Sequence, residues 1–473
     1  MLETDGELME NDGAPTVRAT IVSGVPEDAI PSLFASASCS PGGIEAALTE
    51  LRQTSSALAA TPPLGLHGLA DQLRAPSLAE HATVHVAVEG VSLLAARALQ
   101  DSRLVSRVLP ADLAVASGLI RPVGLSDALR DKVLAAATAL QRAHINLVER
   151  AAQRLVMRDR ASPSDASASA RDLGLGLIPA ATSTSVYLSA NARVIAHQCQ
   201  KLLAHPQPEV VAAGRAVLQA ARGALPDLFP EVEPSKMRAS ARAEIDGAMA
   251  RLYEPPHEGA NATMVISQPA RLVRHDKDAL ERVVLALAYE GSDASVHAFA
   301  LATSLRAAKE PALSDILRSV LRERAPRELL PRGFEASTMT FEIMADAATA
   351  HDLLRHRTRA AAVQRLGCRL GFHTPEDLLD LGLADFYQDA MLAAQASWAE
   401  IEAEDPRAAE YAVPLGYRVR SLWTLDLRQL VHIVETRSSK ENSTRVRRVA
   451  HALYRTVAAM FPWLRDVIRV DLD

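Results

Sequence analysis

Three adjacent residues, Arg355-His356-Arg357 (the basic triplet), carry the side chains of this sequence that are best suited to bind an anion. A guanidinium group presents a planar fork of hydrogen-bond donors to phosphate or carboxylate oxygens, and histidine changes its charge near neutral pH. Residues 353–367 around the triplet contain no Asp or Glu. Two interpretations are open: the basic end of a helix that complements the helix dipole, or a binding site for an anion.

The elements that must position the triplet have a counterpart earlier in the chain. Aligning Glu80 with Glu335, an offset of 255 residues, superposes apolar residues spaced two apart: Val84, Val86 and Val88 on Met339, Phe341 and Ile343. This spacing predicts a half-buried strand in both segments. The same offset continues into a helical pattern and places the triplet opposite Gln100, Asp101 and Ser102. The recurrence favours the anion site over a solvated helix end.

A second pair of segments is related by an offset of 235 residues. The superposed residues are similar in type: Pro179 on Pro414, Asn191 on Asp426, Arg193 on Arg428, and His197 on His432. The Arg and the His are four residues apart, so each pair lies on one face of a predicted helix. Ser189 and Thr424 precede these helices and are predicted as their N-caps. An exposed pair that the repeat preserves for structural reasons is the alternative.

These two pairs of segments predict the organisation of the chain. Its 473 residues are too many for one hydrophobic core, so two domains are expected. Each copy ends in an amphipathic helix followed by Phe-Pro, and a connector rich in Pro, Ala and charge follows the first. We predict an α+β protein of two tandem copies, helix-rich with a central sheet in each, at residues 1–231 and 232–473. The Ser/Ala-rich residues 160–172 predict a mobile polar loop.

Composition excludes several classes of function. The formal net charge of -6 gives no overall field for nucleic acid, and the basic stretch around the triplet has no interleaved aromatic residues. The start of the chain is acidic and unlike a signal peptide, and no stretch of about 18 apolar residues predicts a membrane span. The three cysteines, Cys39, Cys199 and Cys368, are far apart, which indicates a reducing, cytoplasmic setting.

One cluster resembles a metal site, although we expect none. His373, Glu376, Asp377 and Asp380 could be ligands. The same residues are better explained as a helix start, with Thr374 as N-cap, Pro375 at the first helical position and acidic residues in the first turn. Cys368 has basic neighbours but no identifiable catalytic partners, so a buried structural thiol is expected.

The order of these motifs resembles that of the flavin-dependent thymidylate synthase family. Glu335, the triplet, Pro414, the Thr424 to Arg428 stretch and His432 follow one another as the motifs of that family do. The resemblance implies FAD as cofactor. It implies flavin contacts from Arg355, His356, Arg357, Arg428 and His432 in the second copy, and from Ser77, Glu80, Asn191, Arg193 and His197 in the first. Arg437 matches a residue that binds the substrate phosphate.

Several positions depart from the family pattern. Where the family holds deoxyuridylate with Ser, Asn-Glu, Ser and Arg, this sequence has Ala360, Ala362-Val363, Arg365 and Gly367. A phosphate-binding Arg before the Pro is Glu410 in the second copy and Leu175 in the first, and the counterpart of Arg437 in the first copy is Leu202. The resemblance therefore implies that the flavin contacts remain, while most of the residues that bind deoxyuridylate are replaced.

Two functions from different classes follow. The first is a FAD-dependent enzyme that transfers a one-carbon group reductively to a small or nucleotide-like acceptor other than deoxyuridylate. The resemblance implies methylenetetrahydrofolate and NADPH as co-substrates, and a homodimer of tandem chains that reproduces the family tetramer. In such a dimer the triplet of the second copy and Asn191 of the first could complete each other. The second is a non-catalytic scaffold or binding protein. No general base is assigned.

Overall fold

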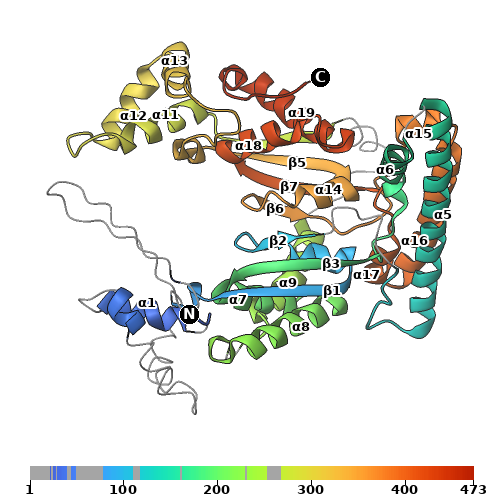
Figure 1. Cartoon of the computed structure of the whole chain (residues 1–473). Helices are drawn as coiled ribbons and strands as arrows, with labels where there is room; N and C mark the ends of the chain where they lie inside the picture. Colours follow the sequence, from blue (N-terminus) through green and yellow to red (C-terminus); the bar gives the residue numbers. More distant parts are fainter. Residues whose placement is uncertain are drawn as a thin grey trace. The chain divides into compact units, whose positions relative to one another are not determined.

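The computed structural model describes residues 22, 25–27, 29–39, 44–49, 78–109, 118–159, 162–229, 232–252 and 268–472 (Figure 1). The chain forms two compact units, and it passes between them more than once. The first unit comprises Met1–Val91, Ala95–Ala111 and Ser183–Arg251. The second unit comprises Ser92–Leu94, Asp112–Thr182 and Leu252–Asp473. Neither unit is a continuous half of the sequence.

The first unit is built on a three-stranded sheet. Its strands are β1 (Thr83–Ser92), β3 (Ser183–Asn191) and β2 (Ser106–Val108), in the order β1-β3-β2. Alternate residues of β1 and β3 are buried with the apolar faces of α7 (Ala192–Leu203) and α8 (Pro208–Ala224). The other helices described here are η1 (Leu78–Glu80), α4 (Leu93–Leu99), η4 (Pro226–Leu228), α1 (Ile30–Cys39) and α9 (Lys236–Leu252). The strand predicted around Val84 is confirmed.

The second unit contains a four-stranded antiparallel sheet. Its strands are β4 (Ala270–His275), β5 (Thr338–Asp346), β7 (Arg418–Asp426) and β6 (Ala360–Val363), in the order β4-β5-β7-β6. Met339, Phe341 and Ile343 of β5 are almost completely buried, as the alternating pattern predicted. Their core includes α18 (Leu427–Arg437), α19 (Thr444–Met460), α11 (Ala279–Glu290) and α13 (Glu310–Val320). In Figure 1, α18 lies along β5 and β7. Helix α12 (Ala298–Ala307) packs on α11.

A helical layer of the second unit joins segments that are far apart in the sequence. The long helices α5 (Asp127–Asp159) and α16 (Ala384–Glu404) lie side by side and share one hydrophobic core (Figure 1). Leu147 of α5 and Met391 of α16 are fully buried in it. The shorter helices of this layer are α6 (Pro163–Gly174), η3 (Leu175–Leu177), α15 (Glu376–Asp380), α17 (Pro406–Ala409) and η6 (Glu410–Ala412). Residues 118–182 therefore fold together with the C-terminal part of the chain.

The prediction of a mobile loop at residues 160–172 is wrong for the residues that the structure describes. From Pro163 onward they form α6. Ser162 caps this helix by accepting a hydrogen bond from the Asp165 amide, and Pro163 lies in its first turn. The low hydrophobicity of the stretch was misleading, because small alanines suffice for close contact with α5 and are good helix formers. Ala166 and Ala170 are buried.

The order of elements recurs along the chain. Helix η1 is followed by β1, α4, β2, α5, α6, η3, β3, α7, α8 and η4. Helix η5 (Arg332–Ala336) is followed by β5, α14 (Ala347–Leu353), β6, α15, α16, α17, η6, β7, α18, α19 and η7 (Pro462–Arg465). Except for α15, the second series repeats the first element by element. The register differs by one residue: Ser189 pairs with Ser106, whereas Thr424, 235 residues later, pairs with Ala360 and not with Ala361.

Within the second unit, two segments related by the offset of 235 pair with each other. The amide of Ala180 donates to the carbonyl of Val413 (2.9 Å), and the amide of Leu415 donates to the carbonyl of Ile178 (2.8 Å). Pro179 and Pro414 lie between these bonds as a single antiparallel bridge. Each bond is the counterpart of the other under the offset, so the pairing has local two-fold character.

Candidate functional site

The basic triplet lies in a turn between α14 and β6. Helix α14 is capped by Asp346, whose side chain accepts a hydrogen bond from the Thr349 amide (2.8 Å), and it ends at Leu353. Beyond this helix the amide of Arg355 donates to the carbonyl of Asp352 (3.2 Å), and that of His356 donates to the carbonyl of Leu353 (3.2 Å). The triplet therefore follows the helix in a tight turn rather than forming its last turn.

His356 is the least exposed member of the triplet. Its Nε2 accepts a hydrogen bond from Nε of Arg437 (2.8 Å), at the C-terminal end of α18. The His356 ring meets the His432 ring edge to face, with 5.9 Å between the ring centroids. Burial lowers the pKa of His356 to about 3, and the positive charges of Arg437 and Arg359 act in the same direction. The imidazole is therefore neutral at neutral pH and accepts from Arg437.

Arginine side chains surround this neutral ring. Arg355 is more than half exposed and pairs with Asp352 (Nε to Oδ1, 2.9 Å), while Arg357 is exposed. Arg437 lies 3.9 Å from the same carboxylate and also donates to Asn442 Oδ1 (3.1 Å). The Asp352 carboxylate thus lies close to two guanidinium groups, those of Arg355 and Arg437. The turn carries excess positive charge, which is suited to attract an anion.

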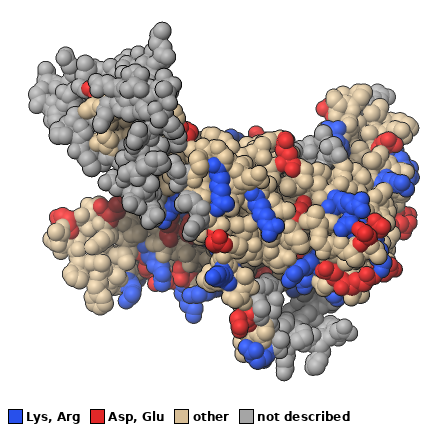
Figure 2. All heavy atoms as spheres, turned by 90° about the horizontal axis from the view of Figure 1, so that it is seen from below, with Lys and Arg blue, Asp and Glu red and all other residues tan. Residues whose placement is uncertain are grey.

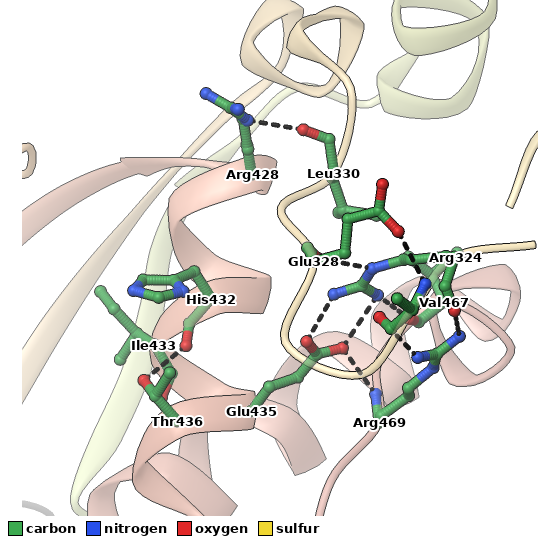
Figure 3. A network of polar contacts seen from close by, with 11 residues as sticks. Arg324, Glu328, Leu330, Arg428, His432, Ile433, Glu435, Thr436, Val467 and Arg469 are labelled. Atoms are coloured by element: carbon green, nitrogen blue, oxygen red, sulfur yellow. Dashed lines mark hydrogen bonds and ion pairs between the residues drawn. The ribbon is translucent and has the colours of Figure 1, made fainter.

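Arg428 and Glu435 of helix α18 lie toward the loop that precedes η5, whereas His432 points away from that loop (Figure 3). Arg428 donates to the carbonyl of Leu330 (2.6 Å) and to Glu335 Oε1 (2.9 Å), so its guanidinium group is turned away from His432 (Figure 3). Desolvation, with Arg437 and Arg428, holds the pKa of His432 below its usual value, although Glu435 opposes this. His432, on the other side of the helix, lies next to the triplet, since its ring meets that of His356.

A buried ion pair fixes the same face of α18. Glu435 accepts from Arg324 (2.5 and 3.1 Å) and from the amide of Arg469 (2.9 Å), as Figure 3 shows. The guanidinium group of Arg469 donates to the carbonyls of Ala325 and Arg324. The loop after α13 and the C-terminal segment are thereby held on α18. The helix that carries His432 and Arg437 is a rigid support for the site.

Comparison with known proteins identifies this part of the chain. Residues 271–463 match the family described as thymidylate synthase complementing protein. This matched part of the chain is similar to that family, and it is called the thymidylate synthase complementing protein domain below. The matched range contains the triplet, α18 and Arg437, so it confirms the resemblance to the flavin-dependent thymidylate synthase family that the motifs indicated.

Relatives extend beyond the thymidylate synthase complementing protein domain. The UPF0159 protein of Chlamydia pneumoniae is 28% identical over 407 residues, which cover 82% of this chain and 76% of that protein. The UPF0159 protein of Chlamydia muridarum is 26% identical over 415 residues (83% and 78%). The UPF0159 protein of Thermoplasma acidophilum is 23% identical over 297 residues (62% and 58%). Similarity to the two chlamydial proteins therefore includes residues before the domain.

The first unit repeats one contact of the thymidylate synthase complementing protein domain. Arg193 pairs with Glu80, just as Arg428 pairs with Glu335, and both residues of the earlier pair are about half exposed. His197 is exposed one turn after Arg193 on α7. Ser77 lies outside the described residues. The structure brings Glu80 and Arg193 together, as it does Glu335 and Arg428.

Asn191 and Asp426 are the N-caps of α7 and α18. Asn191 accepts from the amide of Val194 (2.9 Å), and Asp426 accepts from the amide of Gln429 (2.8 Å). The predicted caps, Ser189 and Thr424, are wrong, because β3 and β7 continue for two further residues. The side chains of Ser189 and Thr424 instead bond across the sheets, to His85 (2.8 Å) and Thr340 (3.0 Å).

The counterpart of the triplet in the first unit has the opposite charge. Asp101, at the position of His356, pairs with Lys201 near the C-terminal end of α7, and Lys201 also donates to the Asp101 carbonyl (2.6 Å). A contact between turn and helix end exists in both units. In the first unit this contact is the ion pair of Asp101 with Lys201, so the negative charge of Asp101 is neutralised.

The position of the family's phosphate-binding arginine holds a carboxylate in this domain. Glu410 is 6% exposed, and its Oε2 accepts a hydrogen bond from the amide of Leu366 (3.1 Å). The alanines at Ala360 and Ala362 lie in strand β6. A carboxylate buried at this point repels a phosphate. The position that the resemblance assigned to a phosphate-binding arginine therefore offers no cation to a phosphate.

The cluster at His373 is bound to an arginine. Arg448 contacts His373 Nε2 (2.9 Å) and Glu376 (3.2 Å). Among the residues that the structure describes, no three His, Cys, Asp or Glu side chains are grouped so that they could hold a metal ion. The predicted cap at Thr374 is wrong by one residue: α15 begins at Glu376, and Thr374 accepts instead from Gln388 (3.2 Å).

The two described cysteine thiols, Cys199 and Cys368, are buried. Burial raises both pKa values, that of Cys199 to about 11, so neither thiol is a nucleophile at neutral pH. The face drawn in Figure 2 shows Lys and Arg interspersed with Asp and Glu. In the described part of the chain, no helix is both long enough and apolar enough to cross a bilayer.

Sequence reasoning missed three residues of the site: Asp352, Asn442 and Arg359. Asp352 and Asn442 bind Arg437 from different elements, which no local pattern indicates. Arg359 lies in the same basic stretch as the triplet, but it is 6% exposed whereas Arg355 and Arg357 point to solvent. The lack of an acidic residue nearby was a signal that its charge had to be satisfied by other groups.

Proposed function

We propose that this protein is a FAD-dependent enzyme that transfers a one-carbon group reductively to an acceptor other than deoxyuridylate. The family of the C-terminal domain supports the reaction type. The observation that carries the proposal is the neutral His356, held by Arg437 within a turn that also presents Arg355 and Arg357. Such a turn offers charge for a diphosphate and uncharged rings for a planar ligand.

The residues present fit a flavin nucleotide. Arg355 and Arg357 are exposed donors for phosphate oxygens, and His356 and His432 meet as an uncharged edge-to-face pair beside them. Asp352 is paired with Arg355, which limits its repulsion of an anion. When bound, the flavin supplies the electron transfer, and the protein supplies binding and orientation. Methylenetetrahydrofolate as carbon source and NADPH as electron source belong to the proposal on the strength of the family.

The acceptor is proposed to lack the phosphate of a nucleotide monophosphate. Glu410, buried and bonded to the Leu366 amide, occupies the position where the family has a phosphate-binding arginine. Ala360 and Ala362 remove two polar contacts at the neighbouring strand. A small metabolite or a modified nucleoside fits these changes better than deoxyuridylate. Arg437 is a candidate for substrate contact on the strength of the resemblance, and its Nε is oriented by His356.

We also propose that the chain is a tandem duplication. The repeated order of elements, the equivalent Glu–Arg pairs and the reciprocal backbone bonds around Pro179 and Pro414 support this. Residues 1–231 and 232–473 would be the two copies. A homodimer would then reproduce the family tetramer, and Asn191, Arg193 and His197 could contribute to a site of the second copy. The buried thiols Cys199 and Cys368 are in keeping with a cytoplasmic protein.

The visible absorption spectrum of the purified protein with added FAD tests the proposal. Flavin bands that bleach with NADPH in the absence of air are expected from the wild type. The double variant Arg355→Ala/Arg357→Ala should lose FAD affinity by on the order of a hundredfold, since two charge-assisted contacts are removed. The matched control, Arg271→Ala/Arg274→Ala, removes two exposed arginines from β4 and should bind FAD normally.

The alternative is a non-catalytic scaffold that retains the fold. The turn of the first unit, where Asp101 pairs with Lys201, supports this alternative, because that turn forms with an acidic residue at the position of His356. A wild-type protein that remains colourless and binds no FAD at excess ligand would establish this alternative and end the proposal of an enzyme.

A further inference from the structure

Arg359 is a buried cation directly behind the basic triplet. Only 6% of its surface is exposed. Its Nη1 donates to the carbonyl of Leu353 (2.8 Å) and to the carbonyl of His356. The guanidinium carbon lies 4.3 Å from the centroid of the Trp423 ring on β7. Arg359 therefore joins the turn to the sheet beneath it.

These contacts compensate the burial of the charge. Carbonyls at the end of a helix carry partial negative charge, and Leu353 is the last residue of α14. The face of an indole ring also attracts a cation, and Trp423 is itself 2% exposed. A residue that is stacked on a rigid strand and bonded to two carbonyls has little freedom to move. The backbone bound to it is restrained to the same degree.

Both carbonyls belong to the turn that carries the triplet. One precedes the triplet by two residues, and the other is that of its central residue. Between them the chain makes a single turn, so fixing these two points fixes the directions in which Arg355 and Arg357 leave it. The carbonyl of His356 is held on one side by Arg359, while its ring is held on the other by Arg437.

We propose that Arg359 is a positioning residue that locks the turn in the conformation in which the triplet receives its anionic ligand. The part that concerns the ligand rests on the proposed function; the part that concerns the turn does not. Arg359 is not among the positions to which the resemblance assigned a contact. Its role follows from the planar guanidinium group, which can stack and donate at the same time. Lysine can do this only in part.

Two variants of Arg359 and one control test this role. Arg359→Met removes the charge and both donors but keeps much of the apolar stem, and Arg359→Lys keeps the charge and one donor. The control is Arg150→Met on α5 of the same unit, which removes a cation that lies 5.0 Å from the Phe386 ring centroid. Both Met variants lose one cation–aromatic contact, but only Arg359 is bonded to the turn.

The first measurement is hydrogen exchange in the protein without added flavin. The amides of Leu354, Arg355 and His356 are bonded within the turn. In Arg359→Met they should exchange at least about tenfold faster than in the wild type, because local opening is no longer opposed. Arg359→Lys should be intermediate, and Arg150→Met should match the wild type. Unchanged exchange in both Arg359 variants would overturn the proposal.

The second measurement is the dissociation constant for FAD. It should rise by about tenfold in Arg359→Met and by less in Arg359→Lys, because a misplaced binding group weakens contacts that remain present. If the turn loosens while FAD affinity stays unchanged, Arg359 does not position the triplet for this ligand. If no protein binds FAD, including the wild type, the proposed function fails, while hydrogen exchange still decides whether Arg359 locks the turn.

Discussion

At the scale of single residues, the site depends on one histidine kept neutral among cations. Three charged neighbours in sequence would repel one another, but burial of His356 against Arg437 leaves only the arginines charged. The ring then serves as an acceptor that orients Arg437. Positive charge for a ligand comes from Arg355 and Arg357, which remain exposed. Arg355 and Arg357 are thus the hydrogen-bond donors of the triplet for a ligand, and His356 is the acceptor that orients Arg437.

This arrangement predicts how stability depends on pH. The pKa of His356 is about 3 in the folded protein and near 6.5 in the unfolded chain. Between these values the unfolded chain binds a proton that the folded protein does not, so stability falls as the pH falls. The slope attributable to His356 is about 1.4 kcal/mol per pH unit. Chemical denaturation of wild type and His356→Gln between pH 3.5 and 6.5 measures it. Equal slopes would contradict the assignment.

A second prediction concerns the carboxylate at the position of the phosphate-binding arginine. Glu410→Gln should lower the free energy of unfolding by about 1–3 kcal/mol, because a buried acceptor of the Leu366 amide is weakened. Glu404→Gln is the control, since Glu404 pairs with Lys132 at the surface and should cost less than about 1 kcal/mol. Urea denaturation at pH 7 distinguishes them. Equal effects would mean that Glu410 has no special structural role.

At the scale of secondary structure, the sequence predicted β1 and β5 but not the other described strands, and it placed the helix starts poorly. Period-two burial is a strong signal, and Val84 and Met339 both lie on buried faces. The N-caps were misplaced because Ser189 and Thr424 are good caps by residue type, whereas the sheets pair for two residues longer. Helix α6 was missed because its alanines are weakly hydrophobic, although they pack against α5. Tertiary contacts decided each of these cases.

The two N-caps give a prediction for α18 and α7. Burial raises the pKa of Asp426, so its ionised form costs stability in the folded state. Asparagine caps a helix as well as aspartate does. Asp426→Asn should therefore be at least as stable as wild type at pH 7, and the difference should vanish below about pH 3.8, where the unfolded carboxyl is also protonated. Asp426→Ala and Asn191→Ala should each lose about 1 kcal/mol. Thermal unfolding of the set measures these changes.

At the scale of the whole molecule, sequence reasoning found a repeat but not the compact units. The repeat is a local pattern, readable from residue types at a fixed offset. The units depend on contacts between residues more than 200 positions apart, such as those of α5 with α16. The bridge between Pro179 and Pro414 joins the two most similar segments within one unit. The sequence relates Pro179 to Pro414 by an offset, but only the three-dimensional structure shows that the two residues are paired with each other.

Two glycines make this meeting possible. A Cβ atom at Gly176 would lie 2.2 Å from the hydroxyl oxygen of Tyr387, and one at Gly416 would lie 3.0 Å from the carbonyl oxygen of Gly176. Gly176→Ala should therefore destabilise the protein by about 1–3 kcal/mol. Adding Tyr387→Phe removes the clashing oxygen and should restore part of the loss. Gly223→Ala, with nothing within 4 Å, is the control and should be neutral or stabilising. No coupling in this double-mutant cycle would contradict the close approach.

The shared helical core predicts that the two sequence halves stay together after cleavage. A protease site inserted within residues 253–267 would separate α5 and α6 from α16 and β7 in the covalent chain. Because Leu147 and Met391 are fully buried in the same core, dissociation would expose a large apolar surface. The fragments should co-elute in size-exclusion chromatography and separate only in denaturant. Leu147→Asp, which places a charge in this core, should weaken their association. Fragments of the wild type that separate under native conditions would show that each half buries its own core, and that the second unit is not held together by α5.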